Sequence, residues 1–431
     1  MVTRVARERD VDKLAGRMPM LLGLLLASAS PAEALGRCWL PSWASAQQIP
    51  EERNALPTAD LADATLRQIV RVTLGGKAVR LRISNQFGTA PLRIGAAHVA
   101  LSADPATPRL GSGGHPLTFG GRASITVPAG ADYLSDPVAL AVPPLSHLAV
   151  SLYLPEAPSQ QTSHPGSRAT SYLLHGNAVG AGDMPGAKTV AHWYQLAAVE
   201  VDTAPGSSAI VALGDSITDG YGVQPDTDLR WPDHFARRLQ DNARTRLFSV
   251  LNHGIGGNRL LADGVGPNAM ARFERAIAQP GVSHVLILEG VNDLGTLGRD
   301  GGGAEAYRDL SDRMIVAYAQ MVRAARARGV RAIGATIMPY GGSDYYRLTE
   351  PSEAARQAVN AWIRSPGNFD GVVDFDAIMR DPTNPQRLRP DVDSGDHLHP
   401  SLAGYRKMAD AVPLSLFSGR GPQPGCRPTR D

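Results

Sequence analysis

From residue 207 onward, short apolar runs alternate with amphipathic stretches of helical length, and this alternation constrains the fold more than any other feature. The runs SAIVALG, HVLILEG and RAIGATIMP have the length and composition of buried strands. Between such runs the sequence predicts helices, of which the clearest are residues 231–243, 304–328, 352–364 and a last helix from about residue 401. Strands that alternate with helices of this length form a parallel sheet covered on both faces. We therefore predict an α/β domain over residues 206–431.

The first half of the chain has a different pattern. Between about residues 66 and 200 it contains no convincing helix of ten or more residues, and several short segments alternate apolar and polar residues as strands do. Residues 66–88 alternate in this way around Gly75-Gly76, which predicts a β-hairpin. We predict a β-sandwich accessory domain over residues 37–205, in which residues 37–60 are a lead-in.

The N-terminus has the pattern of an export signal. Basic residues precede an apolar stretch that begins at Met18, and small residues follow it up to Gly36. This stretch is too short to span a bilayer as a helix. We predict a signal peptide over residues 1–36 and hence a secreted or periplasmic protein; a buried helix of the folded protein is the alternative.

Charge and cysteine usage narrow the function classes. A formal net charge of +2 is too small to predict binding to nucleic acid or to an acidic membrane surface. In an oxidising compartment the two cysteines, Cys38 and Cys426, could form a disulfide or remain two free thiols. The sequence contains no phosphate loop, dinucleotide-binding glycine pattern or zinc-ligand spacing, so we expect no cofactor and no metal. The oligomeric state is not predicted.

The segment VALGDSITDGYG, residues 211–222, places a serine where the first apolar strand gives way to a loop. Open α/β sheets bind ligands at this edge, so Ser216 is a candidate nucleophile. The nucleophile pattern G-x-S-x-G of the α/β-hydrolases is absent, because residue 218 is threonine. We expect Gly214 to allow a sharp turn after the strand and Asp215 to hold the loop.

A serine needs a base to become a nucleophile, usually a histidine that is oriented by a carboxylate. Near the C-terminus, Asp396 precedes His399 by three residues, directly before the last helix. His397 is a rival base, but Pro400 fixes the second histidine at the start of the helix. The structural alternative is that Asp396 only caps this helix, and no third ligand supports a metal site at the two histidines.

Acyl transfer also requires N–H donors for the negative oxygen that forms when a serine attacks a carbonyl. Gly256-Gly257 follows the second apolar strand, and its bare backbone can approach a ligand closely. Asn292 follows the third strand and offers a side-chain amide. Each motif alone is more often a turn or a helix cap. Together with the serine and the Asp-His pair, they form a complete set for acyl transfer.

These four blocks resemble the SGNH hydrolases, also called the GDSL esterase/lipase family. The matching residues are Gly214-Asp215-Ser216, Gly257, Gly290-Val291-Asn292-Asp293 and Asp396-His397-Leu398-His399-Pro400. The resemblance implies a flavodoxin-like three-layer α/β/α fold, with Ser216 as nucleophile, His399 as general base and Asp396 as its orienter. It also implies an oxyanion hole made of the Ser216 N–H, the Gly257 N–H and the Asn292 side chain.

Two positions depart from the family pattern. Val291 stands where many members have a glycine, which would narrow the pocket, and Gly256 stands where many have a serine. Further candidates for contact with the substrate are Asp215, Asn258, Arg230, Trp231 and Tyr340, with Tyr345-Tyr346 on the same loop as the last of these.

The arrangement of a β domain before an SGNH domain resembles, more loosely, the carbohydrate-esterase and xylanase-associated members of the family. We therefore expect a serine esterase that acts on acyl groups of carbohydrates. A lipase or lysophospholipase and an acyltransferase with the same triad are the alternatives within this chemistry. A non-catalytic carbohydrate-binding protein is the alternative of another class.

Overall fold

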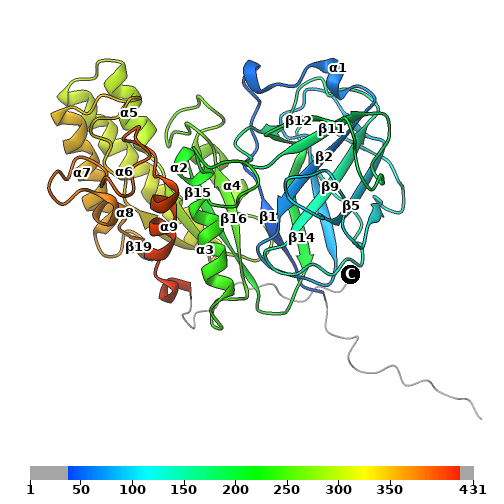
Figure 1. The fold of residues 1–431 in the computed structure, drawn as a ribbon. Helices are drawn as coiled ribbons and strands as arrows, with labels where there is room; N and C mark the ends of the chain where they lie inside the picture. Colours follow the sequence, from blue (N-terminus) through cyan, green and yellow to red (C-terminus); the bar gives the residue numbers. More distant parts are fainter. Residues whose placement is uncertain (1–36, 418–431) are drawn as a thin grey trace, which may run out of the picture. The chain divides into compact units, whose positions relative to one another are not determined.

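The second half of the chain builds a five-stranded parallel sheet in the computed structural model, which describes residues 37–417 (Figure 1). In spatial order the strands are β16 (Phe248–Gly254), β15 (Ser208–Gly214), β17 (Val282–Leu288), β18 (Arg331–Ala335) and β19 (Gly371–Val373). All neighbours pair in parallel, and the first strand lies between the second and the third, which is the flavodoxin-like order. The predicted parallel α/β architecture is confirmed; we call residues 208–417 the α/β region.

Helices connect these strands close to the predicted positions. They are α2 (Ser216–Asp219), α3 (Trp231–Gln240), α4 (Ala269–Ile277), α5 (Val291–Arg299), α6 (Ala304–Ala327), α7 (Glu350–Arg364), α8 (Phe375–Met379) and α9 (Leu402–Ala411), followed by the 3-10 helix Leu414–Phe417. Helices α3 and α9 lie side by side and α3 contacts β16, whereas α6 packs against α7, α4 and β18 (Figure 1). The long strands β15 and β17 are buried at every position, which explains their continuous apolar sequences.

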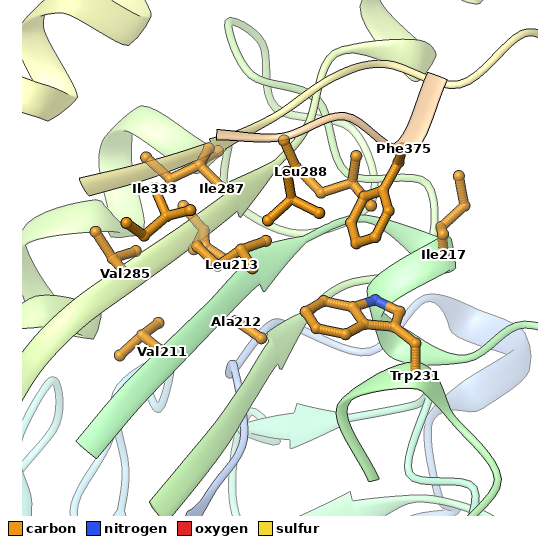
Figure 2. Packing of buried hydrophobic residues seen from close by; sticks show 14 of the residues in the cluster. Val211, Ala212, Leu213, Ile217, Trp231, Val285, Ile287, Leu288, Ile333 and Phe375 are labelled. Atoms are coloured by element: carbon orange, nitrogen blue, oxygen red, sulfur yellow. The ribbon is translucent and has the colours of Figure 1, made fainter. Parts of the chain in front are cut away.

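The core of the α/β region joins the sheet to the helices that cover it. Figure 2 shows side chains of β15, β17 and β18 together with Trp231 and Phe375, whose ring centroids are 6.0 Å apart. Trp231 at the start of α3 is fully buried in this cluster. Fixing the start of α3 in this way also fixes the loop that leads to it from α2.

The first half, which we call the β region (residues 39–202), consists mainly of two antiparallel sheets. One has the order β12 (Lys188–Val190), β11 (Ser171–His175), β2 (Ala64–Arg71), β9 (His147–Leu154), β5 (Ala96–Leu101), β6 (His115–Leu117). The other has the order β1 (Trp39–Ala44), β14 (Leu196–Asp202), β3 (Val79–Ser84), β8 (Asp132–Leu134). The remaining elements are the pairs β4 (Leu92–Ile94) with β7 (Ile125–Val127) and β10 (Ser163–His164) with β13 (Trp193–Tyr194), the helix α1 (Thr58–Leu61) and the 3-10 helix Glu52–Asn54. Both large sheets contribute to one apolar core.

The predicted hairpin around Gly75-Gly76 is wrong. Strand β2 pairs with β9 and β11, and β3 pairs with β14 and β8, so the two strands belong to different sheets. The glycines serve close packing instead: a Cβ on Gly75 would lie 2.7 Å from the Val142 carbonyl, and one on Gly76 would lie 2.7 Å from Val201 Cβ. The alternating pattern identified the strands but not their partners, because it reports burial and not pairing.

Residues 37–60 are more than the predicted lead-in. Strand β1 is buried throughout, pairs with β14 and contacts β16, the edge strand of the parallel sheet. Ser249 of β16 donates a hydrogen bond to the Pro41 carbonyl at 2.8 Å, and Val250 N–H donates to Thr73 Oγ1 at 2.9 Å. The β region is therefore attached to the edge of the parallel sheet, and the parallel bridge from Ser45 to Asn252 leads the chain after β1 towards the carboxyl end of β16.

Two sequence predictions fall at the chain ends. The predicted signal peptide, residues 1–36, lies outside the described residues, as does Cys426. Cys38 is buried and disulfide-bonded. Among residues 37–417 no helix has both the length and the apolar character needed to cross a bilayer.

Candidate active site

Ser216 lies at the junction of β15 and the short helix α2. Asp215 caps this helix, since its Oδ1 accepts a hydrogen bond from the Ile217 N–H at 2.9 Å. Gly214 is needed for close approach and not for a special turn conformation, because a Cβ at this position would collide with the side chain of Thr218. Ser216 is thus presented by a rigid cap at the carboxyl edge of the sheet, where ligands bind in open α/β folds.

The serine, the histidine and the aspartate form a hydrogen-bonded chain. Ser216 Oγ lies 2.9 Å from His399 Nε2, and His399 Nδ1 lies 2.7 Å from Asp396 Oδ2. Burial by itself would raise the pKa of Asp396, but hydrogen bonds from the His399 ring and from the backbone N–H groups of His399 and Leu398 hold that pKa well below its usual value. An ionised Asp396 holds the imidazole with Nε2 free to accept a proton from the serine.

The neighbouring histidine has a separate partner. His397 Nδ1 lies 2.6 Å from Asp393 Oδ2, and the side chain of His397 does not line the pocket that contains Ser216. The backbone of His397 is in the left-handed region with φ 59°. The loop therefore pairs each histidine with its own aspartate and gives only His399 access to the serine.

The three predicted oxyanion donors line the same pocket as the serine hydroxyl. The backbone N–H groups of Ser216 and Gly257 have no hydrogen-bond acceptor among residues 37–417, and Gly257 has a positive φ of 73°, which favours glycine. Asn292 Nδ2 donates one hydrogen to the Asn258 carbonyl at 2.7 Å. Since a side-chain amide has two hydrogens, one remains for a ligand. The arrangement offers three donors to a negative oxygen near Ser216.

Tyr346 fixes the orientation of the Asn292 amide. Its hydroxyl donates to Asn292 Oδ1 at 2.8 Å, so the nitrogen and not the oxygen of the amide is left for the pocket. The ring packs on helix α5 over Gly295, where any Cβ would collide with it. Gly295 and Tyr346 lie far apart in the sequence. The sequence placed Tyr345-Tyr346 on a loop near the cleft, but it did not predict the hydrogen bond between Tyr346 and Asn292.

A second tyrosine pair surrounds His399. Tyr221 stacks on the imidazole with ring centroids 4.1 Å apart, and Tyr345 meets it edge-on at 5.6 Å. Their hydroxyls are 2.7 Å apart. The sequence analysis did not predict Tyr221 as a pocket residue. Its neighbours Gly220 and Gly222 are typical of an exposed loop, and this loop lies next to the serine.

The pocket around Ser216 is a cavity of about 410 Å³ whose walls come from both halves of the chain. The α/β region supplies Ser216, the three oxyanion donors, His399 and the tyrosines described above. The β region supplies Gln48, Glu51, Arg53, Asn54, Pro165, Gly166, Arg168 and His192. None of these β-region residues was predicted, because their sequence neighbourhood carries no catalytic motif.

Residues 212–407 match the model of the GDSL-like lipase/acylhydrolase family. The chain carries a GDSL-like hydrolase domain. This family assignment makes the protein a carboxylic ester hydrolase and confirms the resemblance that the four sequence blocks indicated. No curated protein matches the chain.

Solved structures are similar to about half of the chain. A variant of an acetyl xylan esterase from Geobacillus stearothermophilus is 22% identical with a TM-score of 0.37, and the match covers 53% of this chain and 99% of that one. A GDSL-like lipase from Bacteroides thetaiotaomicron is 19% identical with a TM-score of 0.36, over 49% of this chain and 88% of that one.

Three of the predicted substrate contacts are corrected, because the GDSL-like domain uses these residues in its interior. Arg230 is buried and pairs with Asp233 at 2.7 Å, Trp231 is in the apolar core, and Tyr340 is fully buried. None of them lines the pocket with Ser216. Loop position had suggested exposure, but these large side chains gain more from packing and ion pairing at the helix ends than from solvent. Val291 is also buried in the core and does not narrow the pocket.

Asp215 and Asn258, the other predicted contacts, lie behind the pocket wall of the GDSL-like domain. Both are almost completely buried. Asn258 donates to the carbonyls of Val265 and Pro267 and accepts from Arg272 at 2.8 Å, so it holds the loop that carries Gly257. Gly256, which stands where many family members have a serine, lines the pocket with its backbone.

A buried charged cluster lies beneath the catalytic loops; we define it as Asp215, Arg272, Glu289 and Asp293. Arg272 donates to Glu289 Oε1 at 3.1 Å and to the Gly214 carbonyl at 3.0 Å. Burial raises the pKa of Asp215 to about 7 and that of Asp293 to about 6, and it raises the pKa of Glu289 well above its usual value. Arg272 and Glu289 were not predicted from the sequence, since their elements read as ordinary helix and strand. Among residues 37–417 no group of acidic, histidine or cysteine side chains could hold a metal ion.

Proposed function

We propose that this chain hydrolyses carboxylic esters of carbohydrates through an acyl-enzyme on Ser216. The observation that carries the proposal is the chain of hydrogen bonds from Ser216 Oγ to His399 Nε2, 2.9 Å, and from His399 Nδ1 to Asp396 Oδ2, 2.7 Å. In this arrangement a hydroxyl, a base and the group that orients the base are within transfer distance of one another.

The reaction proceeds in two halves. His399 takes the proton of Ser216 as the hydroxyl oxygen attacks the ester carbonyl, and the negative oxygen is stabilised by N–H donors from Ser216, Gly257 and Asn292. The tetrahedral intermediate collapses to an acyl-serine, and His399 gives the proton to the departing alcohol. Water then attacks the acyl-serine by the same route, which releases the acid and restores the serine.

The walls of the pocket support a sugar ester as substrate. The rings of Tyr221, Tyr345 and Tyr346 line the cavity, and aromatic faces suit the apolar faces of sugar rings. Its volume of about 410 Å³ accommodates a small glycosyl ester. We assign residues 37–205 as an accessory β-sandwich and residues 206–431 as the catalytic domain, in a protein that is exported by its N-terminal signal.

The test is hydrolysis of para-nitrophenyl acetate by the wild type and by Ser216→Ala. We expect kcat to fall by roughly 10⁴-fold or more, because the nucleophile is lost. Ser365→Ala, which removes an exposed hydroxyl bound to the Ala361 carbonyl, is the matched control and should hydrolyse at the wild-type rate. Equal rates for wild type and Ser216→Ala would remove the proposal. A comparison of acetylated xylan with a phospholipid as substrate then distinguishes a carbohydrate esterase from a lipase. A comparison of water with a sugar as acceptor distinguishes a hydrolase from an acyltransferase.

A further inference from the structure

Arg168 is a cation at the active-site pocket that has no anionic partner among residues 37–417. It lies on the loop between β10 and β11 and lines the cavity with Ser216. Among residues 37–417 its side chain forms no hydrogen bond or ion pair, and its Nε is buried without a partner. Its guanidinium carbon lies 5.9 Å from the centroid of the Tyr221 ring. The Nε–H of Arg168 is buried, but the four N–H groups on Nη1 and Nη2 form no hydrogen bond within residues 37–417 and remain for a ligand.

The structure holds Arg168 in place in spite of local strain. Its φ is 49°, in the left-handed region, where residues other than glycine are uncommon and are often found at binding sites. Asp226 of the α/β region fastens this loop: its N–H donates to the Arg168 carbonyl at 2.9 Å. The Asp226 carboxylate accepts from Thr170 N–H at 2.7 Å and from Thr170 Oγ1 at 2.6 Å. A loop of the β region is thus fixed next to Tyr221.

Arg168 faces one defined part of an ester. During hydrolysis His399 gives its proton to the departing alcohol, so the alcohol portion of the substrate lies on the His399 side of the carbonyl. Tyr221 stacks on His399 with 4.1 Å between ring centroids, and the Arg168 guanidinium contacts the same tyrosine ring. Arg168 therefore lies next to the alcohol portion and not next to the acyl portion.

The two carboxylates that line the pocket, Asp219 and Glu51, are each hydrogen-bonded to another group. The Asp219 carboxylate is bound to His164 Nε2 at 3.0 Å, and the Glu51 carboxylate accepts from Asn54 Nδ2 at 2.8 Å. Neither of them reaches Arg168. Arg53 adds a second cation to the β-region wall.

We propose that Arg168 binds a carboxylate on the alcohol portion of the ester, so that the preferred substrates are acyl esters of acidic, uronate-type sugars. The planar guanidinium matches a carboxylate with two parallel hydrogen bonds, and in the described part of the chain no carboxylate pairs with it. The inference rests on the proposed function and specifies its substrate class. It also gives the β region a role, because that region supplies the recognition group.

The direct test compares two acetyl esters that differ only in the substrate carboxylate, an O-acetyl methyl glucuronoside and the O-acetyl methyl glucoside acetylated at the same position. We expect wild-type kcat/KM to be roughly 10- to 100-fold higher for the acidic ester, as a hydrogen-bonded charge pair contributes. Arg168→Gln should lose this preference, because its kcat/KM falls far more on the acidic ester than on the neutral one, and Arg168→Lys should retain part of the preference. Arg93→Gln removes an exposed arginine that pairs with Glu156 at 3.6 Å on the same region, and as the matched control it should retain the full preference.

A second measurement does not depend on the folding of any variant. Free glucuronate should inhibit wild-type hydrolysis of para-nitrophenyl acetate competitively, and glucose at equal concentration should not. No preference in the wild type, an unchanged preference in Arg168→Gln, or no inhibition by glucuronate would overturn the inference while para-nitrophenyl acetate is still hydrolysed. A preference for a hemisuccinate over a butyrate ester, with none for the uronate, would place the anion on the acyl side and would also overturn it. Failure of the wild type to hydrolyse any ester refutes the proposed function itself.

Discussion

Two aspartates lie next to the proposed catalytic side chains, and their surroundings give them opposite properties. Asp396, at the pocket, receives hydrogen bonds from the His399 ring and from two backbone N–H groups, and its pKa is held well below the usual value. Asp215, adjacent to Ser216, is fully buried with Glu289 and Asp293 nearby, and burial raises its pKa to about 7. One residue type thus serves as a fixed negative charge in one place and as a structural cap in the other.

The difference shows where a site of this kind places its charges. At the pocket, hydrogen bonds to the ionised form outweigh desolvation; beneath it, desolvation of Asp215 outweighs the attraction of the nearby Arg272. The boundary passes between two consecutive residues, since Asn292 lines the pocket and Asp293 is buried in the charged cluster. We therefore expect substitutions at the pocket to change the reaction rate and substitutions in the buried charged cluster to change the stability of the fold.

The largest effect is expected when the negative charge at the pocket is removed by substitution. Asp396→Asn should lower kcat by roughly 10⁴-fold, because the amide favours the wrong tautomer of His399. Asp393→Asn, which alters the partner of the neighbouring His397, is the matched control and should leave kcat close to that of the wild type. Steady-state kinetics on one chromogenic ester measures both. Similar losses in the two variants would show that the loop as a whole, and not the Asp396 charge, determines the rate.

The next largest effect is expected when the buried charged cluster loses its arginine. Arg272→Met should lower the free energy of unfolding by about 3–5 kcal/mol, because it leaves buried carboxyl groups without their cation. Arg275 lies three residues further along the same helix, where it is exposed and pairs with Asp132 at 2.8 Å. Arg275→Met should therefore cost less than about 1 kcal/mol. Urea unfolding measures both, and equal costs would mean that the buried cluster adds nothing beyond a surface pair.

The pH dependence of stability should have opposite signs for the two aspartates. For Asp215 the native pKa of about 7 lies above the unfolded value, so the native state binds more protons and the wild type loses stability as the pH rises from about 4 to about 7. Asp215→Asn keeps the cap and removes this loss, so at pH 8 it should be more stable than the wild type by on the order of 2 kcal/mol.

For Asp396 the native pKa is lowered, so its contribution to stability is present above the unfolded pKa of about 4 and is lost as the pH falls further. Asp396→Asn should therefore be less stable than the wild type at pH 7, and the difference should shrink as the pH falls below about 4. Urea unfolding between pH 3 and pH 8 gives both curves. If the two differences changed with pH in the same direction, the contrast between the two sites would be lost.

The smallest effect tests the residue at the boundary. Tyr346→Phe frees the Asn292 amide to rotate and should lower kcat about tenfold, as the loss of one oriented hydrogen bond predicts, with little change in KM. Tyr307→Phe is the matched control: its hydroxyl donates to the Leu294 carbonyl of the same helix at 3.1 Å, away from the pocket. A drop in kcat for both variants would indicate a general loosening of α5 instead of a specific role of Tyr346.

Much of the α/β region could be predicted because its information is local. Each long strand is an apolar run, and α6, predicted at 304–328, is observed at Ala304–Ala327. The hydrogen-bonded group of Ser216, Asp396 and His399 could also be anticipated, since the serine follows a parallel strand at the edge where such sheets bind ligands and the Asp-His pair has the spacing of an oriented base before the last helix. The β region was less accessible, because alternation does not say which strands pair, and the hairpin at Gly75-Gly76 failed for this reason.

By itself the sequence determined the strand-helix order and the residue types of an acyl-transfer site, because apolar periodicity and short motifs are written in neighbouring positions. Only the tertiary structure decided which distant groups complete the site. Arg168 reaches the pocket from the β region, and Tyr346 meets Asn292 over the bare backbone of Gly295. It also decided that Asp215 is a buried cap and Asp396 a fixed charge. These outcomes depend on burial and on partners far away in the chain, and the desolvation and hydrogen bonding that they create have no signature in local sequence.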